Sequence, residues 1–278
     1  MRKVCIGISG WTYPGWKKVF YPKGLPRTKE LNYASTHLNS LEINGTFYSL
    51  QKPSSFKSWY DQTPEGFVFA VKGGQFITHV RRLKDIEGPL AFFFGSGILE
   101  LKEKLGPVLW QFPPNVMLKD DRFEKFLKLL PKTTTDASRI MERHRDRLRY
   151  PEQIESAAGI PIRHAFEFRH PSFFNPDFFA LLRAHGAAIV HAHAAPKCPY
   201  TEEITSDFIY VRLHGEGKAY KKGYPTKELL KWQEKIESHW RGRDVFLYFS
   251  TDAKEFAPKG AVELSNLIQT APPRMRAA

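Results

Sequence analysis

The fold is decided by three short stretches, Ser40-Leu41-Glu42-Ile43-Asn44, His164-Ala165-Phe166-Glu167-Phe168-Arg169-His170 and Ile209-Tyr210-Val211-Arg212-Leu213-His214. In each stretch, apolar residues alternate with charged or amide residues toward the end of the run. Because successive side chains of a strand point to opposite faces, the polar members of each stretch share one face. Ionised groups are costly to bury without partners. Strands that repeatedly carry them at the same end therefore predict a functional site.

Further apolar runs continue this pattern along the whole chain, separated for the most part by segments with helical periodicity. The predicted strands are Val4–Ser9, Ser40–Asn44, Phe67–Lys72, Pro107–Gln111, Ala165–Arg169, Ala188–His193, Phe208–His214 and Val245–Ser250. Strands that alternate with helices run parallel, and eight such repeats in 278 residues favour an α/β fold with a closed (β/α)8 TIM-type barrel. A doubly wound open sheet is the alternative, but Ser9-Gly10-Trp11-Thr12-Tyr13 lacks the glycine-rich turn that such a sheet needs.

The chain is predicted to form a single TIM-type barrel domain over residues 1–271. The segment 133–159 is interpreted as a basic, partly helical and solvent-facing insertion before the fifth strand, because it contains five arginines between Arg139 and Arg149. Residues 272–278 are expected to be a disordered tail.

Composition limits the class of protein and of partner. The net charge of +13 favours anionic partners such as phosphate esters or nucleic acid, although a merely basic protein is the alternative. Two cysteines exclude a disulfide framework and a cysteine metal cluster. No apolar stretch is long enough to span a membrane, so we expect a soluble, cytoplasmic protein without a membrane partner. The sequence does not indicate an oligomeric state.

Barrel enzymes carry their catalytic groups at the C-terminal ends of the strands. The two-residue period predicts a ring of inward polar side chains at that end. Its predicted members are Glu42, Asn44, Lys72, Gln111, Glu167, Arg169, His191, His193, Tyr210, Arg212, His214, Tyr248, Ser250 and Asp252. An ion-pair network that only fills the barrel is the alternative, but contributions from seven strands favour a site.

The side-chain types in this ring suggest roles. Glu42 and Glu167 are candidates for general acid and base, and His214 could transfer a proton near neutral pH. The cations and the remaining polar and aromatic groups are candidates for substrate binding, since arginine grips phosphate or carboxylate bidentately and aromatic rings stack on planar ligands. These binding candidates are Lys72, Arg169, Arg212, Asn44, Gln111, His170, Ser250 and Asp252, with Trp11, Tyr13 and Tyr48 from the loops.

A metal centre is a further hypothesis. His191 and His193 share one strand face at a spacing that suits metal binding, and Glu42, Glu167, His214 and Asp252 could complete a ligand set. Three nearby cations would oppose a divalent ion, so no cofactor is predicted and a divalent metal stays an alternative. No helical His-Glu-x-x-His motif, phosphate-binding loop or Gly-x-Ser-x-Gly turn is present.

The same residues carry a family resemblance that spans nearly the whole chain. The matching stretches are 7–14, 19–22, 42–48, 67–72, 106–114, 166–172, 210–215 and 248–252. They resemble the YecE-like family, catalogued as domain of unknown function 72. The resemblance implies a TIM-type barrel of unsettled activity. This chain departs from the family pattern at His193, where the family usually has Asp, and at Ser250 and Thr251, where it usually has Asn.

Three functions follow from these observations. The first is an enzyme of the barrel mouth that acts on a phosphorylated or other anionic substrate by acid–base chemistry, in the manner of a hydrolase. The second is a nucleic-acid-binding or phosphodiesterase-like protein, with or without a metal, suggested by the Arg139–Arg149 segment, the basic tail and a likeness in outline to phosphodiesterase barrels. The third is a barrel that binds a small anionic ligand without turning it over.

Overall fold

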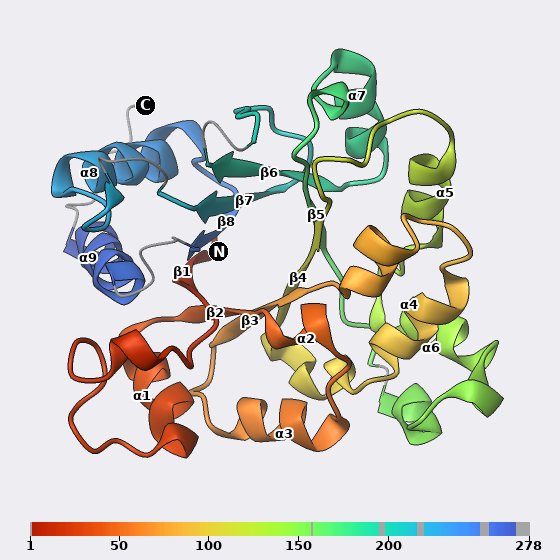
Figure 1. The fold of residues 1–278 in the computed structure, drawn as a ribbon, viewed down its shortest axis with the longest axis horizontal. Coiled ribbons are helices and arrows are strands. Elements are labelled where there is room, and N and C mark those ends of the chain that lie inside the picture. Colours follow the sequence, from red (N-terminus) through yellow and green to blue (C-terminus); the bar gives the residue numbers. More distant parts are fainter. Residues whose placement is uncertain (1, 157, 195–197, 216–219, 251–255, 271–278) are drawn as a thin grey trace.

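Strands β1 to β8 form a closed parallel barrel in which each strand pairs with its sequence neighbours and β8 pairs with β1 (Figure 1). The structure is a computed structural model, and it describes residues 2–156, 158–194, 198–215, 220–250 and 256–270. The strands are β1 Val4–Ser9, β2 Ser40–Ile43, β3 Val68–Lys72, β4 Leu105–Gln111, β5 His164–Glu167, β6 Ala188–His193, β7 Phe208–Leu213 and β8 Asp244–Phe249. The predicted (β/α)8 barrel is confirmed.

Helices surround this barrel (Figure 1). They are α1 Glu30–His37, α2 Gly45–Tyr48, α3 Pro53–Asp61, α4 Glu87–Phe94, α5 Arg122–Leu129, α6 Thr134–Glu142, α7 Pro176–Ala184, α8 Thr226–Glu234 and α9 Ala257–Thr270. Helix α7 shows how local sequence sets the bounds. The Asn175 Oδ1 accepts a hydrogen bond from the Phe178 amide, Pro176 occupies the first helical position, and Gly186 turns the chain away with a φ of +64°.

The alternating pattern separates two cores. Side chains such as Val68, Ala70 and Leu109 fill the barrel interior, whereas Phe69 and Trp110 pack outward against the helices. The inward side chains are small or medium on β3 to β6 and aromatic on β7 and β8, and polar groups follow at the last residues of the strands. The predicted inward direction is confirmed for the polar residues of the second, third, fourth, fifth, seventh and eighth strands that the structure describes.

Strand β6 is the exception, and the prediction that His191 and His193 face the interior is wrong. Ala192 pairs with the inward Arg212, so the two histidines point to the outer side. The His191 Nε2 lies 3.0 Å from the Glu203 carbonyl oxygen, and the His193 Nδ1 lies 2.7 Å from the Tyr224 hydroxyl. Both imidazoles are therefore packed beneath the outer layer, away from the proposed ring.

The basic segment after α5 is anchored to the fold and is only partly solvent-facing. Helix α6 begins with a capping box between Thr133 and Asp136, and buries Ile140 and Met141 on the side that packs against α4 (Figure 1). Its arginines are exposed, but Arg139, Arg143 and Arg145 form ion pairs with Asp136, Glu87 and Glu142. Much of the positive charge is thus compensated locally.

Some predictions fall on residues that the structure leaves undescribed, namely Thr251, Asp252 and the tail 272–278. Among the described helices, none combines the length and the apolar character that crossing a membrane requires.

Candidate active site at the barrel mouth

Arg212 of β7 is the centre of a buried network at the C-terminal end of the barrel. Its Nε and Nη2 donate to the two carboxylate oxygens of Glu42, at 3.1 and 3.0 Å. Its Nη1 donates to Glu167 Oε2 at 2.6 Å, and its Nη2 also donates to Ser250 Oγ at 2.9 Å. One guanidinium thus joins β2, β5, β7 and the end of β8. The geometry uses the rigid fork of an arginine, which a lysine does not offer.

Glu42 is enclosed on every side. Besides Arg212, the Ser9 hydroxyl and the Tyr210 hydroxyl each donate to its carboxylate at 2.7 Å. Burial opposes its ionisation, but the Arg212 charge and these hydrogen bonds outweigh burial and hold the pKa of Glu42 below its ordinary value. Glu42 is therefore a buried carboxylate with its acceptor capacity in use.

Glu167 is also fully buried, and it contacts three groups of the site. Burial again opposes ionisation, while Arg212, His214 and Arg169 hold the pKa of Glu167 well below its ordinary value. The Arg169 Nη2 lies 3.4 Å from Glu167 Oε1, and the His214 Nε2 lies 3.5 Å from Glu167 Oε2. These two contacts are longer than the Arg212 contact, so Glu167 is committed mainly to Arg212.

Lys72 is the second cation of the mouth and has no carboxylate within salt-bridge distance among the described residues. Its Nζ donates to Gln111 Oε1 at 2.7 Å and lies 4.0 Å from the centre of the Phe47 ring. Burial, assisted by the Arg212 charge, lowers the pKa of Lys72 to about 8. A lysine in this state can give up or accept a proton near neutral pH.

These groups surround an open cavity of about 230 Å³, which we call the mouth cavity. It is lined by Ser9, Tyr13, Trp16, Asn44, Tyr48, Lys72, Gln111, Arg169, Arg212, His214, Phe249, Ser250 and Ala257. Most of the predicted binding residues are therefore brought together. Ser9, Phe249 and Ala257 were not among the predicted residues, although Ser9 carries a usable signal because it ends β1 in the inward phase of Cys5.

Glu42 and Glu167 do not line the mouth cavity. Both lie behind Arg212, so the structure favours positioning roles for them over the acid–base roles that the sequence suggested. Glu167 forms an ion pair with Arg212 and faces His214. Among the cations that line the cavity, Glu42 forms an ion pair with Arg212 only.

Trp11 and His170, two predicted binding residues, lie outside the mouth cavity. The Trp11 ring packs edge-on against Trp59, with ring centres 5.3 Å apart. The His170 Nδ1 accepts a hydrogen bond from the Ser172 amide at 3.1 Å and so caps the short helix Pro171–Phe173. Both residues therefore have structural roles in the loops around the mouth.

The metal hypothesis gains no ligand set from the described residues, among which no group of three or more His, Cys, Asp or Glu side chains could hold an ion. The outward direction of His191 and His193 is the main reason, because it removes them from Glu42, Glu167 and His214. The other candidate, Asp252, lies outside the described residues.

Gly73 directly follows Lys72 and lies close to the Trp110 ring, which leads to a first prediction. A Cβ at Gly73 would lie 2.3 Å from the fully buried Trp110 ring, whereas a Cβ at Gly74 would meet only the Thr46 carbonyl oxygen at 3.8 Å. Gly73→Ala is expected to lower the free energy of unfolding by about 1–3 kcal/mol, because an overpacked core must shift backbone or side chains. Urea unfolding measures this, with Gly74→Ala as the matched control. Equal stability of the two variants would contradict the prediction.

Comparisons with known proteins agree with this architecture. The UPF0759 protein YunF of Bacillus subtilis is 24% identical over 301 residues, covering 95% of this chain and 94% of that protein. The UPF0759 protein YecE of Escherichia coli K12 is 31% identical over 123 residues, covering 39% of this chain and 43% of that protein.

Two solved structures have the same fold. A crystal structure of a DUF72 family protein from Thermotoga maritima is 24% identical with a TM-score of 0.72, covering 96% of this chain and all of that one. One from Enterococcus faecalis is 16% identical with a TM-score of 0.67, covering 98% of this chain and 99% of that one. The family model described as protein of unknown function DUF72 matches residues 5–278. The predicted YecE-like membership is thus confirmed, and the chain belongs to the DUF72 family.

Proposed function

We propose that the mouth cavity is the active site of an enzyme that acts on a phosphorylated or other anionic substrate by acid–base chemistry. One observation supports this most strongly. Three cations, Lys72, Arg169 and Arg212, face only two carboxylates, and both carboxylates are committed mainly to Arg212. Lys72 and Arg169 therefore carry charge toward the cavity, and the Nε of Arg169 is buried with no hydrogen-bond partner in the described part of the chain. An anionic group would compensate this charge.

Hydrolysis of a phosphate ester uses these groups in a simple way. Lys72 and Arg169 would bind the phosphate oxygens, with Arg212 behind them. His214 would take a proton from the attacking water as the water oxygen bonds to phosphorus. The ester P–O bond breaks, and the protonated Lys72 would give its proton to the leaving oxygen. Glu167, near the His214 Nε2, would orient the imidazole, as carboxylates do for catalytic histidines on other folds.

A comparison of two histidine variants tests this function. His214 lines the mouth cavity, whereas His170 lies in a neighbouring loop and caps a helix, a role that asparagine can also fill. Wild-type protein is first screened against phosphomonoesters and phosphodiesters. For any substrate that turns over, His214→Asn is expected to lower kcat/KM by about 10²–10⁴-fold, and His170→Asn is expected to leave it near the wild-type value. Turnover that survives His214→Asn, or a complete lack of turnover while inorganic phosphate still binds, would contradict the proposal.

A further inference from the structure

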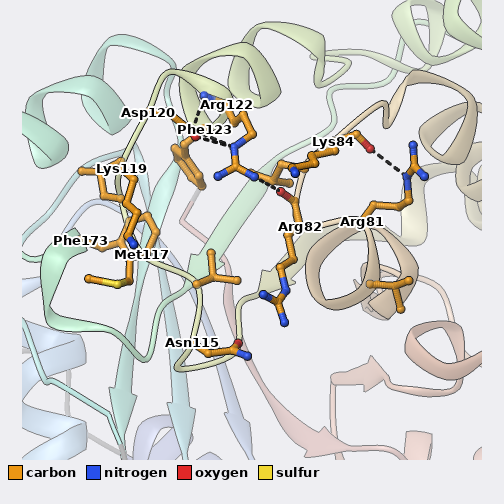
Figure 2. A pocket seen from close by; sticks show the side chains of 14 residues that line it. Arg81, Arg82, Lys84, Asn115, Met117, Lys119, Asp120, Arg122, Phe123 and Phe173 are labelled. Atoms are coloured by element: carbon orange, nitrogen blue, oxygen red, sulfur yellow. Dashed lines mark hydrogen bonds and ion pairs between the residues drawn. The ribbon is translucent and has the colours of Figure 1, made fainter.

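A second cavity, which we call the loop pocket, lies beside the mouth at the same end of the barrel. It is formed mainly by the segments that follow β3 and β4, at residues 80–84 and 115–123, and has a volume of about 460 Å³. Figure 2 shows the side chains that line it. Asp120 is the single carboxylate among the lining residues. Five lining residues are cations, namely Arg81, Arg82, Lys84, Lys119 and Arg122.

Part of this positive charge has no compensation in the described part of the chain. Arg122 pairs with Asp120 at 2.7 Å, and Arg81 pairs with Asp85 at 3.0 Å. In the described ranges no carboxylate lies within salt-bridge distance of the other three cations, Arg82, Lys84 and Lys119. The loop pocket therefore has an excess of positive charge, which favours the binding of an anion.

The backbone that carries these cations is held in an unfavourable conformation. Arg82, Leu83 and Asp85 have φ angles of +46°, +65° and +46°, a region that side-chain-bearing residues rarely adopt. The Leu83 side chain is buried and its amide donates to the Ile77 carbonyl oxygen. From the second loop, the Arg122 Nη1 donates to the Arg82 carbonyl oxygen at 3.3 Å (Figure 2). Strain of this kind persists where the surroundings fix it, and it is common at functional sites.

An apolar strip joins the loop pocket to the mouth cavity. A third cavity, of about 310 Å³, shares Tyr48 with the mouth cavity and Val80 with the loop pocket. Tyr48 is 72% exposed and Phe76 is 53% exposed, and Leu50 and Val80 are exposed beside them. Phe92 also lines this cavity, and the Arg147 guanidinium of the basic segment lies 5.5 Å from its ring centre. Exposed apolar side chains gathered in one strip mark a binding surface.

We infer that the mouth cavity, the apolar strip and the loop pocket together bind single-stranded nucleic acid. Cations at both ends would hold phosphates, and Tyr48 and Phe76 between them would stack on unpaired bases. A cationic groove with interleaved aromatic rings is the arrangement that binds single strands without sequence preference. The inference rests on the proposed function in one respect, since it places the reacting phosphodiester in the mouth cavity.

Binding of labelled oligodeoxythymidine and oligouridine, from single nucleotides to chains of about 16 residues, tests this by fluorescence anisotropy at several salt concentrations. The loop-pocket variant is Arg82→Gln, Lys84→Gln and Lys119→Gln. The control, Lys227→Gln, Lys231→Gln and Arg241→Gln, removes the same charge from exposed residues on α8 and just beyond it, across the molecule from α4 (Figure 1). The loop-pocket variant is expected to bind long strands roughly a hundredfold more weakly at about 0.1 M salt, with a salt slope lower by about two. The control variant is expected to bind like the wild type.

Further outcomes separate this inference from the proposed function. Phe76→Ala is expected to weaken binding of long strands about tenfold, because a stacked base loses its partner. The inference is overturned if the loop-pocket variant retains wild-type affinity and salt slope, or if single nucleotides bind as tightly as long strands, which would indicate a small phosphorylated ligand. In either case the variant's turnover of small esters still tests the mouth chemistry alone. Conversely, His214→Asn could retain full turnover while the loop-pocket variant still binds long strands more weakly than the wild type. That result would reject the proposed function and support the inference.

Discussion

Arg212→Met is expected to lower the free energy of unfolding by about 3–5 kcal/mol, since it leaves two buried carboxylates without their compensating charge. Glu42 and Glu167 are both fully buried, and Arg212 supplies the closest cationic contact to each. Thermal and urea unfolding measure the loss. Arg143→Met is the control, because its ion pair with Glu87 is exposed and such pairs are worth below about 1 kcal/mol.

A triple variant distinguishes charge from packing as the cause. Glu42→Gln and Glu167→Gln added to Arg212→Met remove the uncompensated charges while keeping the side-chain volumes. If stranded carboxylates cause the loss, the triple variant is expected to be more stable than Arg212→Met. A triple variant no more stable than Arg212→Met would show that packing around the guanidinium dominates.

The pH dependence of stability gives an independent check on Arg212. In the wild type, Arg212 holds the pKa of both carboxyls below the ordinary value of 4.5, so their stabilising contribution is present above pH 4.5 and is lost as the pH falls. In Arg212→Met, burial loses its largest opposing contribution and is expected to raise these pKa values, so protonation is expected to recover stability as the pH falls toward 4.5. The two proteins are therefore expected to converge in stability on acidification.

Lys72→Met is expected to lower kcat/KM for the substrate of the mouth by about 10²–10⁴-fold, because the variant lacks both a phosphate ligand and a proton donor. Its stability is expected to stay the same or to rise, since a buried charge is replaced by a methionine of similar length. In the wild type, binding of inorganic phosphate is expected to weaken as the pH rises through about 8, where Lys72 loses its proton. This alkaline weakening is expected to be absent from Lys72→Met.

Unfolding of the wild type adds a second readout for Lys72. The pKa of Lys72 is lowered from 10.5 to about 8 on folding, so the native state releases its proton first and stability is expected to increase between these two pH values. Lys104→Met is the matched control. Lys104 is equally buried, but its Nζ donates to the Tyr60 and Thr63 carbonyl oxygens. That variant is expected to lose about 1–3 kcal/mol of stability with turnover unchanged. The opposite pattern in the two lysine variants would contradict the assigned role of Lys72.

The alternation of side chains was enough to predict most of the mouth. Glu167 and Arg212 each follow an inward residue two positions earlier, Ala165 and Tyr210, and Glu42 follows the buried Ser40 in the same way, so a two-residue period carries them to the same end of the barrel. The predicted direction of the β6 side chains was wrong because Ala188-Ile189-Val190, which precedes the histidines, is apolar on both faces and does not indicate which face is inward. The inward face of β6 is the one that carries the small alanines, which fit the barrel interior. The alternation of side chains alone does not show how much space the interior offers on each face.

Spatial pairing of loops was not predictable in the same way. The loop pocket combines Arg82 and Lys84 with Lys119, which lies in a different loop, and neither segment has regular periodicity. A network of ion pairs between Glu42, Glu167 and the cations was only the alternative interpretation, because sequence spacing places a carboxylate on a face without showing which cation reaches it first. Both features depend on how far the side chains extend and how the loops are folded, which the structure shows and the sequence pattern does not.

The dependence of two carboxylates on one guanidinium has a consequence for the order of biosynthesis. Glu42 and Arg212 are 170 residues apart, so a nascent chain leaves the ribosome with β2 and then β5 complete long before the guanidinium of β7 exists. Until then, closing the half-formed cylinder would trap unneutralised acids in a dry interior, which is strongly unfavourable. Chains truncated before Phe208 are accordingly expected to remain open and accessible to proteases. Closure of the barrel is thereby tied to the emergence of its seventh strand.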